Sequence, residues 1–178
     1  MRNVAVANMN KIRKAVPRIE SRAKIKLGVG SRESVVTVRG SELNEYLVEK
    51  IIEAVDFGFM VDDALLLLNE DFVLEFIEVK EHTPRKNLKE VRARLIGTDG
   101  KARKTIENLT GAEIVINGNS VGLIVDAEHL GSAVQAIESL IQGAKHGNVF
   151  AYLEKQNARK AGLSEDLGLR DDSEGGSI

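Results

Sequence analysis

The segment Ile96–Lys101, with the sequence Ile-Gly-Thr-Asp-Gly-Lys, constrains the fold of this 178-residue chain more than any other. Its two glycines, three residues apart, permit positive φ angles and let a ligand approach the backbone closely. The apolar residues that follow, at spacings of three and four, predict a short helix over Lys101–Leu109. The free N–H groups at the start of that helix face the loop and favour a phosphate. The segment therefore predicts a phosphate-binding loop that opens a helix.

The segments around this loop follow the order of a eukaryotic-type KH domain. In such a module the Gly-x-x-Gly loop clamps the backbone of about four nucleotides. The Asn117-Gly118 pair is a standard dipeptide of a β-hairpin and joins two of the predicted strands. The other predicted elements are an extended segment over Leu88–Ile96 with a helical turn at Arg94–Ile96, strands over Ile114–Ile116 and Val121–Val125, and a helix over Leu130–Ile141.

Basic residues gather in two blocks, although the formal net charge is −2. Lys11–Lys26 holds seven basic residues and one acidic, and Arg85–Lys104 holds eight basic and two acidic. Such blocks favour contact with a polyanion, but a charge run is more often solvated surface. Because the second block adjoins the Gly-x-x-Gly loop, we interpret it as part of a nucleic-acid surface.

The composition excludes several classes of protein. The chain has no cysteine, which excludes disulfides, cysteine-based zinc sites and thiol catalysis and fits a cytoplasmic protein. No apolar run approaches the roughly 20 residues of a membrane span, and no signal peptide is recognisable. The three histidines are scattered and no catalytic motif is present. We therefore expect no catalytic residues, cofactor or metal.

The N-terminal half repeats the second half at an offset of 86 residues. A predicted strand over Ser34–Val38 is followed by a predicted helix over Glu42–Val55. The same order of strand and helix recurs in the second half. The first half lacks a Gly-x-x-Gly loop. At the equivalent place stands Lys14–Arg18, where Pro17 is predicted to occupy the first turn of a helix.

We predict an α+β fold of two tandem type I KH domains, each a three-stranded sheet covered by helices, the first one degenerate. The expected boundaries are 1–80 for the N-terminal KH-like domain without the loop and 84–160 for the C-terminal KH domain. The second domain includes a helical extension over Asn148–Lys160. Residues 161–178, rich in glycine, serine and carboxylates, are expected to form a disordered acidic tail.

Four stretches, together with the order of elements, carry a resemblance to a known family. They are Arg94–Lys101, Thr105–Gly111, Asn117–Val121 and Gly143–Phe150. They resemble the archaeal KH-domain proteins of ribosomal RNA processing, whose eukaryotic relatives are the small-subunit assembly factors partner of Nob-one and Krr-one. The resemblance covers roughly residues 10–160 and is most specific in the second domain.

The resemblance implies a non-catalytic protein that binds single-stranded RNA, namely pre-rRNA or 16S rRNA near its 3′ end, during small-subunit assembly. It also implies partnership with the endonuclease that trims this end and with other assembly factors. The RNA-binding residues carried over by position are the backbone clamp Gly97, Thr98, Asp99, Gly100 and Lys101, the base-groove walls Ile96, Ile106 and Ile116, and the flanking basic residues Arg94, Arg103 and Lys104.

Other interpretations stay open at this point. In one interpretation Gly97 and Gly100 only shape an ordinary turn. The carboxylate of Asp99 supports this interpretation because it repels phosphate, unless it caps the following helix instead. In another, the protein is an interaction adaptor with vestigial KH domains, or a KH protein that acts on other RNA. The adaptor would present an acidic helix stripe to a basic partner, formed by Glu42, Glu45, Glu49 and Glu53.

Overall fold

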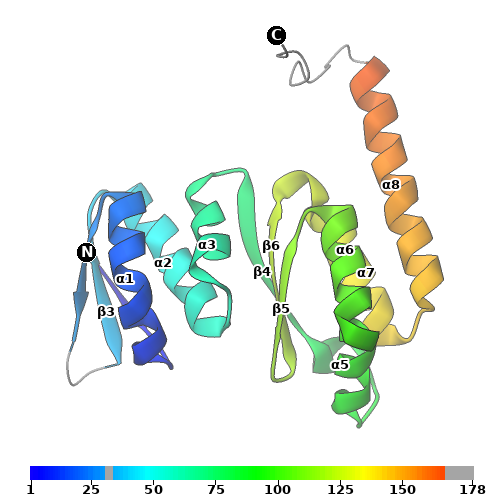
Figure 1. Cartoon of the computed structure of the whole chain (residues 1–178), viewed down its shortest axis with the longest axis horizontal. Coiled ribbons are helices and arrows are strands. Elements are labelled where there is room, and N and C mark those ends of the chain that lie inside the picture. The colour runs from blue at the N-terminus through cyan, green and yellow to red at the C-terminus, as the bar shows by residue number, and fades with distance from the viewer. Residues whose placement is uncertain (31–33, 167–178) are drawn as a thin grey trace.

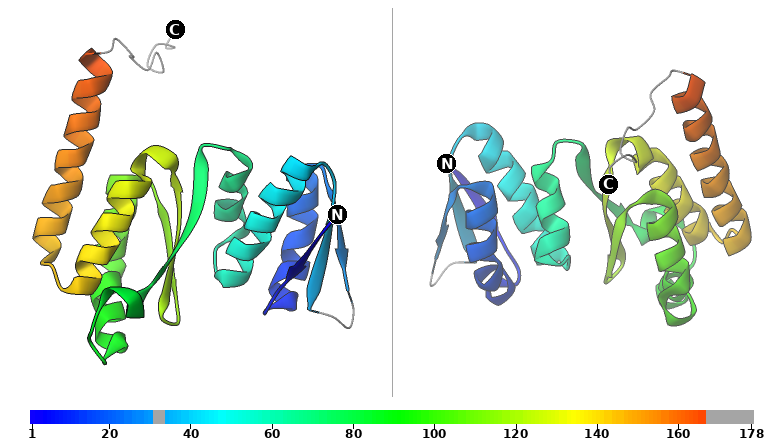
Figure 2. Two further views of the ribbon diagram at one scale, coloured as in Figure 1. Left: turned by 180° about the vertical axis from the view of Figure 1, so that it is seen from behind. Right: turned by 45° about the horizontal axis from the view of Figure 1, so that its top comes forward.

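The computed structural model describes residues 1–30 and 34–166 of the chain. These residues form two α/β units in a row, each with a three-stranded antiparallel sheet (Figure 1). The first sheet, the helices of the first unit, the second sheet and the helices of the second unit follow one another as layers (Figures 1 and 2). The second sheet is therefore enclosed between two layers of helices.

The first unit has the sheet order β1-β3-β2. Its two long helices begin at residues whose side chains accept a backbone N–H, Asn8 from Lys11 and Ser41 from Asn44. The elements are β1 (Arg2–Ala5), α1 (Met9–Ala23), β2 (Lys26–Val29), β3 (Val35–Arg39), α2 (Glu42–Phe57), α3 (Val61–Ala64) and the 3-10 helix η1 (Leu65–Leu68).

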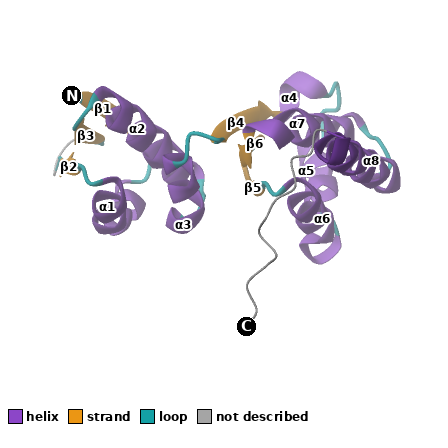
Figure 3. Ribbon diagram, turned by 90° about the horizontal axis from the view of Figure 1, so that it is seen from above, coloured by secondary structure: helices purple, strands orange, loops and turns teal. Residues whose placement is uncertain are grey.

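The second unit has the corresponding sheet order β4-β6-β5. Its long C-terminal helix packs on the outside of the other helices of this unit (Figure 3). The elements are β4 (Phe72–Glu78), α4 (Val79–His82), α5 (Leu88–Ile96), the 3-10 helix η2 (Thr98–Gly100), α6 (Lys101–Thr110), β5 (Glu113–Asn117), β6 (Ser120–Asp126), α7 (Ala127–Gln142) and α8 (His146–Asp166).

The predicted internal repeat is confirmed by the topology. In both units the third strand lies in the middle of the sheet and leads into a 16-residue helix. β3 and β6, and likewise α2 and α7, begin at positions 85 residues apart, within one residue of the predicted offset. The α+β class and the KH order of elements are thus both present.

The prediction of an extended segment over Leu88–Ile96 is wrong. The segment forms the helix α5, with Leu88, Val91 and Leu95 spaced three and four residues apart on its core side. The basic residues between them lower the mean hydropathy of the segment without changing this spacing. The first helix of the KH order is therefore a complete helix and not a single turn.

The expected boundary at residue 80 cuts the second unit. β4 lies before residue 80 and pairs with β6 along its whole length, from Phe72 opposite Asp126 to Glu78 opposite Ser120. Strand pairing is a long-range contact that hydrophobic periodicity does not reveal. The second unit therefore begins at β4 and not at residue 84.

Pro17 lies in the interior of α1 and not in the first turn of a helix, which corrects the prediction. Position 17 is the ninth residue of a helix that runs without interruption from Met9 to Ala23. A proline here removes one intrahelical hydrogen bond. Where the second unit has helix, loop and helix, the first unit has one helix, so it lacks the loop together with one helix.

Both faces of the second sheet are buried. Val121, Leu123 and Val125 of β6 pack into the core under α5, α6 and α7. Ile124, on the opposite face of β6, is fully buried in the core of the first unit. At the neighbouring Gly122 a Cβ atom would come within 2.8 Å of the rings of both Phe57 and Phe59. The central strand of the second sheet therefore contributes side chains to the apolar cores of both units.

The predicted helical extension is present as α8 and is longer than expected, since it runs to Asp166. Residues 161–166 are thus helical, which corrects part of the predicted disordered tail. The remainder of that tail, 167–178, lies outside the described residues. In the part of the chain that the structure describes, no helix combines the length and the apolar character needed to span a bilayer.

Candidate RNA-binding site

The Gly-x-x-Gly loop connects α5 to α6 through a backbone that requires glycine. Gly97 has φ 74° and ψ 176°, a region that essentially only glycine occupies. Its N–H donates to the carbonyl of Ala93 at 2.9 Å and closes α5. A Cβ atom at this position would lie 2.6 Å from the Cβ and 2.7 Å from the backbone N of Ala102. The first glycine therefore lets the loop lie directly against α6.

The second half of the loop is open to solvent. Gly100, with φ 73°, is the N-cap of α6, and a Cβ atom there would meet nothing within 4 Å. Thr98, Asp99 and Lys101 are exposed. No side chain among the described residues caps α6, so the capping role considered for Asp99 is wrong. The N–H groups of Gly100 and Lys101 donate to the carbonyls of Gly97 and Thr98 within the loop. What the start of α6 offers an anion is therefore the positive end of the helix dipole beside an exposed loop.

A groove of about 370 Å³ runs between α6 and β5, and we call it the α6–β5 groove. Its far end is closed by the first unit, where Gly58 lies against Val115. Ile96, at the end of α5, remains 41% exposed, and Ile116 of β5 is half-buried. The lining residues are Gly58, Phe59, Met60 and Asp63 of the first unit, Arg103 and Glu107 of α6, and Glu113, Ile114, Val115 and Ile116 of β5.

Ile106, predicted as a wall of the base groove, is fully buried in the core of the second unit. It shares the core face of α6 with Ala102 and Thr110, at spacings of four residues. This position corrects the prediction. Ile96 and Ile116 keep exposed apolar surface and remain proposed contacts for bases.

The predicted basic residues lie on different sides of the loop. Lys101 and Lys104 are exposed on α6, and the Nε of Arg103 lies 3.7 Å from a carboxylate oxygen of Glu107. The guanidinium of Arg94 donates to the carbonyl of Ala144 at 2.6 Å, on the side where α8 begins. Arg94 thus lines a groove beside the start of α8, whereas Arg103 lines the α6–β5 groove.

Arg92 is a candidate that the sequence reasoning missed. Its guanidinium donates to the carbonyl of Gly118 at 3.0 Å and so joins α5 to the β5–β6 hairpin. Arg92 precedes Ile96 by four residues, a spacing that places both on one side of a helix. The four-residue spacing is visible in the sequence, but it indicates a shared face only in a helix and not in a segment predicted to be extended.

The carboxylates in the α6–β5 groove titrate differently from exposed ones. Burial raises the pKa of Glu113, and the nearby charges of Asp63 and Glu107 raise it further, while Arg103 opposes the shift. Burial and the neighbouring Asp62 likewise raise the pKa of Asp63. The groove therefore takes up protons at a higher pH than isolated carboxylates would.

This arrangement predicts that RNA binding strengthens as the pH falls from 7 through the raised pKa values of Glu113 and Asp63. A raised carboxyl pKa means that negative charge disappears from the groove as the pH drops through it, which removes repulsion of phosphate. Glu113→Gln should bind RNA about fivefold more tightly at pH 7, the effect of roughly 1 kcal/mol per charge, and should respond less to pH. Fluorescence anisotropy titrations at a series of pH values from 7 downwards measure the affinity and its pH dependence for both proteins. If the variant has the same pH dependence as the parent, Glu113 is not the group whose protonation strengthens RNA binding.

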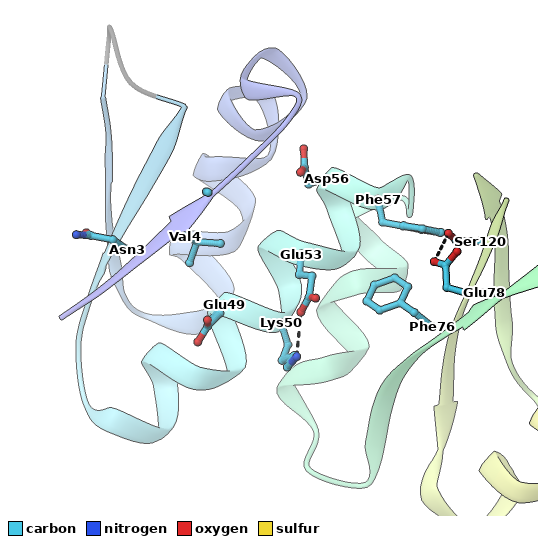
Figure 4. A pocket seen from close by; sticks show the side chains of 11 residues that line it. Asn3, Val4, Glu49, Lys50, Glu53, Asp56, Phe57, Phe76, Glu78 and Ser120 are labelled. Atoms are coloured by element: carbon cyan, nitrogen blue, oxygen red, sulfur yellow. Dashed lines mark hydrogen bonds and ion pairs between the residues drawn. The ribbon is translucent and has the colours of Figure 1, made fainter. Parts of the chain in front are cut away.

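A larger pocket, of about 660 Å³, lies between α2 and β4 and is also lined by several carboxylates (Figure 4). Glu49, Glu53 and Glu78 line it, and the amino group of Lys50 is paired with Glu53 at 2.9 Å. Such a lining repels phosphate. Because this pocket also contains no residue of the loop or of α6, nothing in it indicates RNA binding.

The acidic stripe expected on the first unit is largely engaged within the chain. Glu45 is 5% exposed and accepts the N–H of Gly40 at 3.0 Å. Glu49 pairs with Arg2 at 2.6 Å. Because these carboxylates already have partners, the stripe gives little support to an adaptor for a basic protein.

A βααββα unit with an open Gly-x-x-Gly loop at the start of a helix defines a KH protein of type I, a class that binds single-stranded nucleic acid. Comparison with known proteins supports this assignment to the type I KH class. The family model of the second KH domain of PNO1, described as a eukaryotic type KH-domain (KH-domain type I), matches residues 73–158. Its start coincides with β4 to within one residue, in agreement with the strand pairing.

Similarity extends over the whole of an archaeal relative. Dim2p of Pyrococcus horikoshii has a crystal structure with 30% identity and a TM-score of 0.75, covering 86% of this chain and 98% of that one. A second crystal structure, of an a/eIF2alpha–aDim2p–rRNA complex from the same organism, matches with 29% identity and a TM-score of 0.78 over 89% of this chain and 94% of that one.

Curated relatives are longer than this chain. A KH domain-containing protein of Methanocaldococcus jannaschii is 31% identical over 79% of this chain and 64% of its own length. The pre-rRNA-processing protein pno1 of Aspergillus fumigatus is 35% identical over 62% of this chain and 46% of its own length. The chain belongs to the family of KH-domain proteins that contains PNO1 and archaeal Dim2p, which confirms the resemblance seen in the sequence.

Proposed function

We propose that this protein binds single-stranded small-subunit rRNA near its 3′ end and acts during processing and assembly of that subunit. The observation that carries the proposal is the open loop, which presents exposed Thr98, Asp99 and Lys101 at the positive end of the α6 dipole. Membership of a family with a pre-rRNA-processing protein and an rRNA-bound neighbour supports the choice of RNA.

In this proposal each part of the site has a separate task. The backbone of Gly97–Gly100 and the dipole of α6 hold phosphates, and Lys101 and Lys104 add charge. Ile116, which lines the α6–β5 groove, and exposed Ile96 at the end of α5 offer apolar surface to bases. The first unit closes the groove and does not form a second clamp, since α1 is continuous where the loop would stand.

The protein acts by binding alone, in the cytoplasm, and chemistry on the RNA belongs to a partner. The endonuclease that trims the rRNA 3′ end and other assembly factors are the proposed partners. The initiation factor a/eIF2alpha, which is present in the Pyrococcus horikoshii complex with aDim2p and rRNA, is a further candidate.

Crosslinking tests this function. The purified full chain is mixed with total cellular RNA, irradiated, and the crosslinked nucleotides are mapped. Enrichment at one region near the 3′ end of small-subunit rRNA supports the proposal. Crosslinks scattered over unrelated RNAs point to a KH protein of other specificity, and the absence of crosslinks above background favours an adaptor.

Lys101→Ala is expected to weaken binding several-fold for every single-stranded RNA tested, because a phosphate contact carries no sequence information. The slope of log K against log salt should fall by about 0.7, the value for one phosphate on a single strand. Lys14→Ala, an equally exposed lysine on α1, is the matched control and should change affinity less than about twofold. Equal effects of both changes in anisotropy titrations would mean that the charge of the whole chain, and not the loop, holds the RNA.

A further inference from the structure

A second groove lies on the other face of α6 from the α6–β5 groove, and we call it the α8 groove. It measures about 490 Å³ and is lined by the end of α5, the loop, the first turns of α6 and the start of α8. It shares Gly97, Thr98 and Lys101 with the loop, so it is continuous with the proposed RNA surface. The lining residues are Glu90, Ala93, Arg94, Gly97, Thr98, Lys101, Ala102, Thr105, His146 and Phe150.

The wall that α8 contributes is fixed in place. A ring nitrogen of His146, Nε2, lies 2.8 Å from the carbonyl oxygen of Arg94, and since a carbonyl only accepts, this nitrogen donates. The side chain of Asn157 donates to the carbonyl of Leu109 at 2.7 Å, near the end of α6. Val149 and Leu153 are buried between these two hydrogen bonds. The groove is therefore a preformed feature.

Two rings stand in this wall. Those of His146 and Phe150 are 6.1 Å apart between centroids and tilted by 53°. Phe150 is only partly buried, so one side of its ring is open to the groove. Ala93 and Ala102 line the same groove, and their small side chains leave room for a flat group. By contrast, the one aromatic residue that lines the α6–β5 groove, Phe59, is fully buried.

The charge of the α8 groove suits the same ligand as the loop. Lys101 lies on its rim and the guanidinium of Arg94 lies in its wall, against the single carboxylate of Glu90. Because Thr98 and Lys101 of the loop line the same groove as Phe150, a strand held by its phosphates at the loop would direct a neighbouring base into this groove. Base–aromatic stacking tolerates any base, because every base has a flat face.

We propose that the α8 groove is a stacking subsite for one nucleotide next to those clamped at the Gly-x-x-Gly loop. The occupant is single-stranded RNA that passes over the loop from the α6–β5 groove, with one base against Phe150 and its phosphate near Lys101. This inference rests on the proposed function. It adds that α8 lengthens the RNA site beyond the roughly four nucleotides of a KH clamp.

The test compares a tetranucleotide with six- and seven-nucleotide RNAs extended at either end, using the full chain. Phe150→Leu keeps apolar packing but removes the aromatic face. We expect at least about a fivefold loss of affinity for RNA extended at one end, the contribution of one stacked base, and no loss for the tetranucleotide. Tyr152→Leu, on another side of α8, is the control and should leave both affinities unchanged.

A spectroscopic measurement keeps the test independent of packing losses. The chain has no tryptophan, so Phe150→Trp introduces a single indole. Its emission should change on binding extended RNA and stay constant with the tetranucleotide. Equal binding of short and extended RNA by the parent, or equal losses in both leucine variants, overturns the subsite and leaves the clamp intact. Failure of the parent to bind any of these RNAs overturns the proposed function and the subsite together.

Discussion

Replacing Gly97 with alanine is expected to lower the free energy of unfolding by about 3 kcal/mol, the upper end of the cost of a backbone conformation that only glycine adopts. The new Cβ atom would also overlap the backbone N and the Cβ of Ala102, atoms that a rigid helix cannot move aside. RNA binding should be lost together with stability, because α6 must shift away from the loop. Urea denaturation and anisotropy on the same preparation measure both effects.

Gly100→Ala provides the matched control. Gly100 has nearly the same φ as Gly97, but space surrounds the position of its missing side chain. The substitution should cost about 1 kcal/mol, the strain of a left-handed residue alone. If both alanine variants lose the same free energy of unfolding, the close contact between the loop and α6 contributes nothing to stability.

Thr98→Asp is expected to weaken RNA binding five- to tenfold without lowering stability. The new carboxylate would lie beside Asp99 in the exposed loop, at roughly 4 to 6 Å from a bound phosphate, where each like charge costs about 1 kcal/mol even in solvent. An acidic residue near a helix start is well tolerated by the fold. Salt-dependent anisotropy titrations measure the loss, which should shrink as salt screens the repulsion.

Thr98→Asn separates charge from shape, since asparagine has the size of aspartate without its charge. It should bind RNA within about twofold of the parent. A folded Thr98→Asp variant that binds as tightly as the parent would mean that the loop is an ordinary turn. The adaptor interpretation would then account better for the chain.

Sequence reasoning reaches the loop, the KH order of elements and the internal repeat because each rests on local signals. Gly97, Gly100 and Gly118 are needed for positive φ angles, and a run of residues with the right spacing shows a helix. Where a segment mixes apolar and basic residues, as Leu88–Ile96 does, the periodicity is easily overlooked and the segment is misassigned. Arg92 lies in this segment and is therefore not identified from the sequence as a candidate RNA-binding residue.

Other features depend on contacts between distant parts of the chain. Nothing near Phe72 shows that β4 belongs with β6, and nothing near His146 shows that α8 would return to the loop. Ile106 has the pattern of a groove residue and of a core residue alike, and only packing decides between them. The loop is therefore accessible from the sequence, whereas the two grooves beside it are not.

The burial of Ile124 in the core of the first unit has a consequence for the order in which the chain can fold. The ribosome completes η1 some fifty residues before it adds β6, an interval of roughly 3 to 10 seconds at ordinary rates of synthesis. During that interval Phe76 of β4 can already pack against Phe57, but the apolar surface around Phe57 and Phe59 still lacks the cover of β6. The N-terminal half therefore reaches its final stability only when the central strand of its neighbour has left the ribosome.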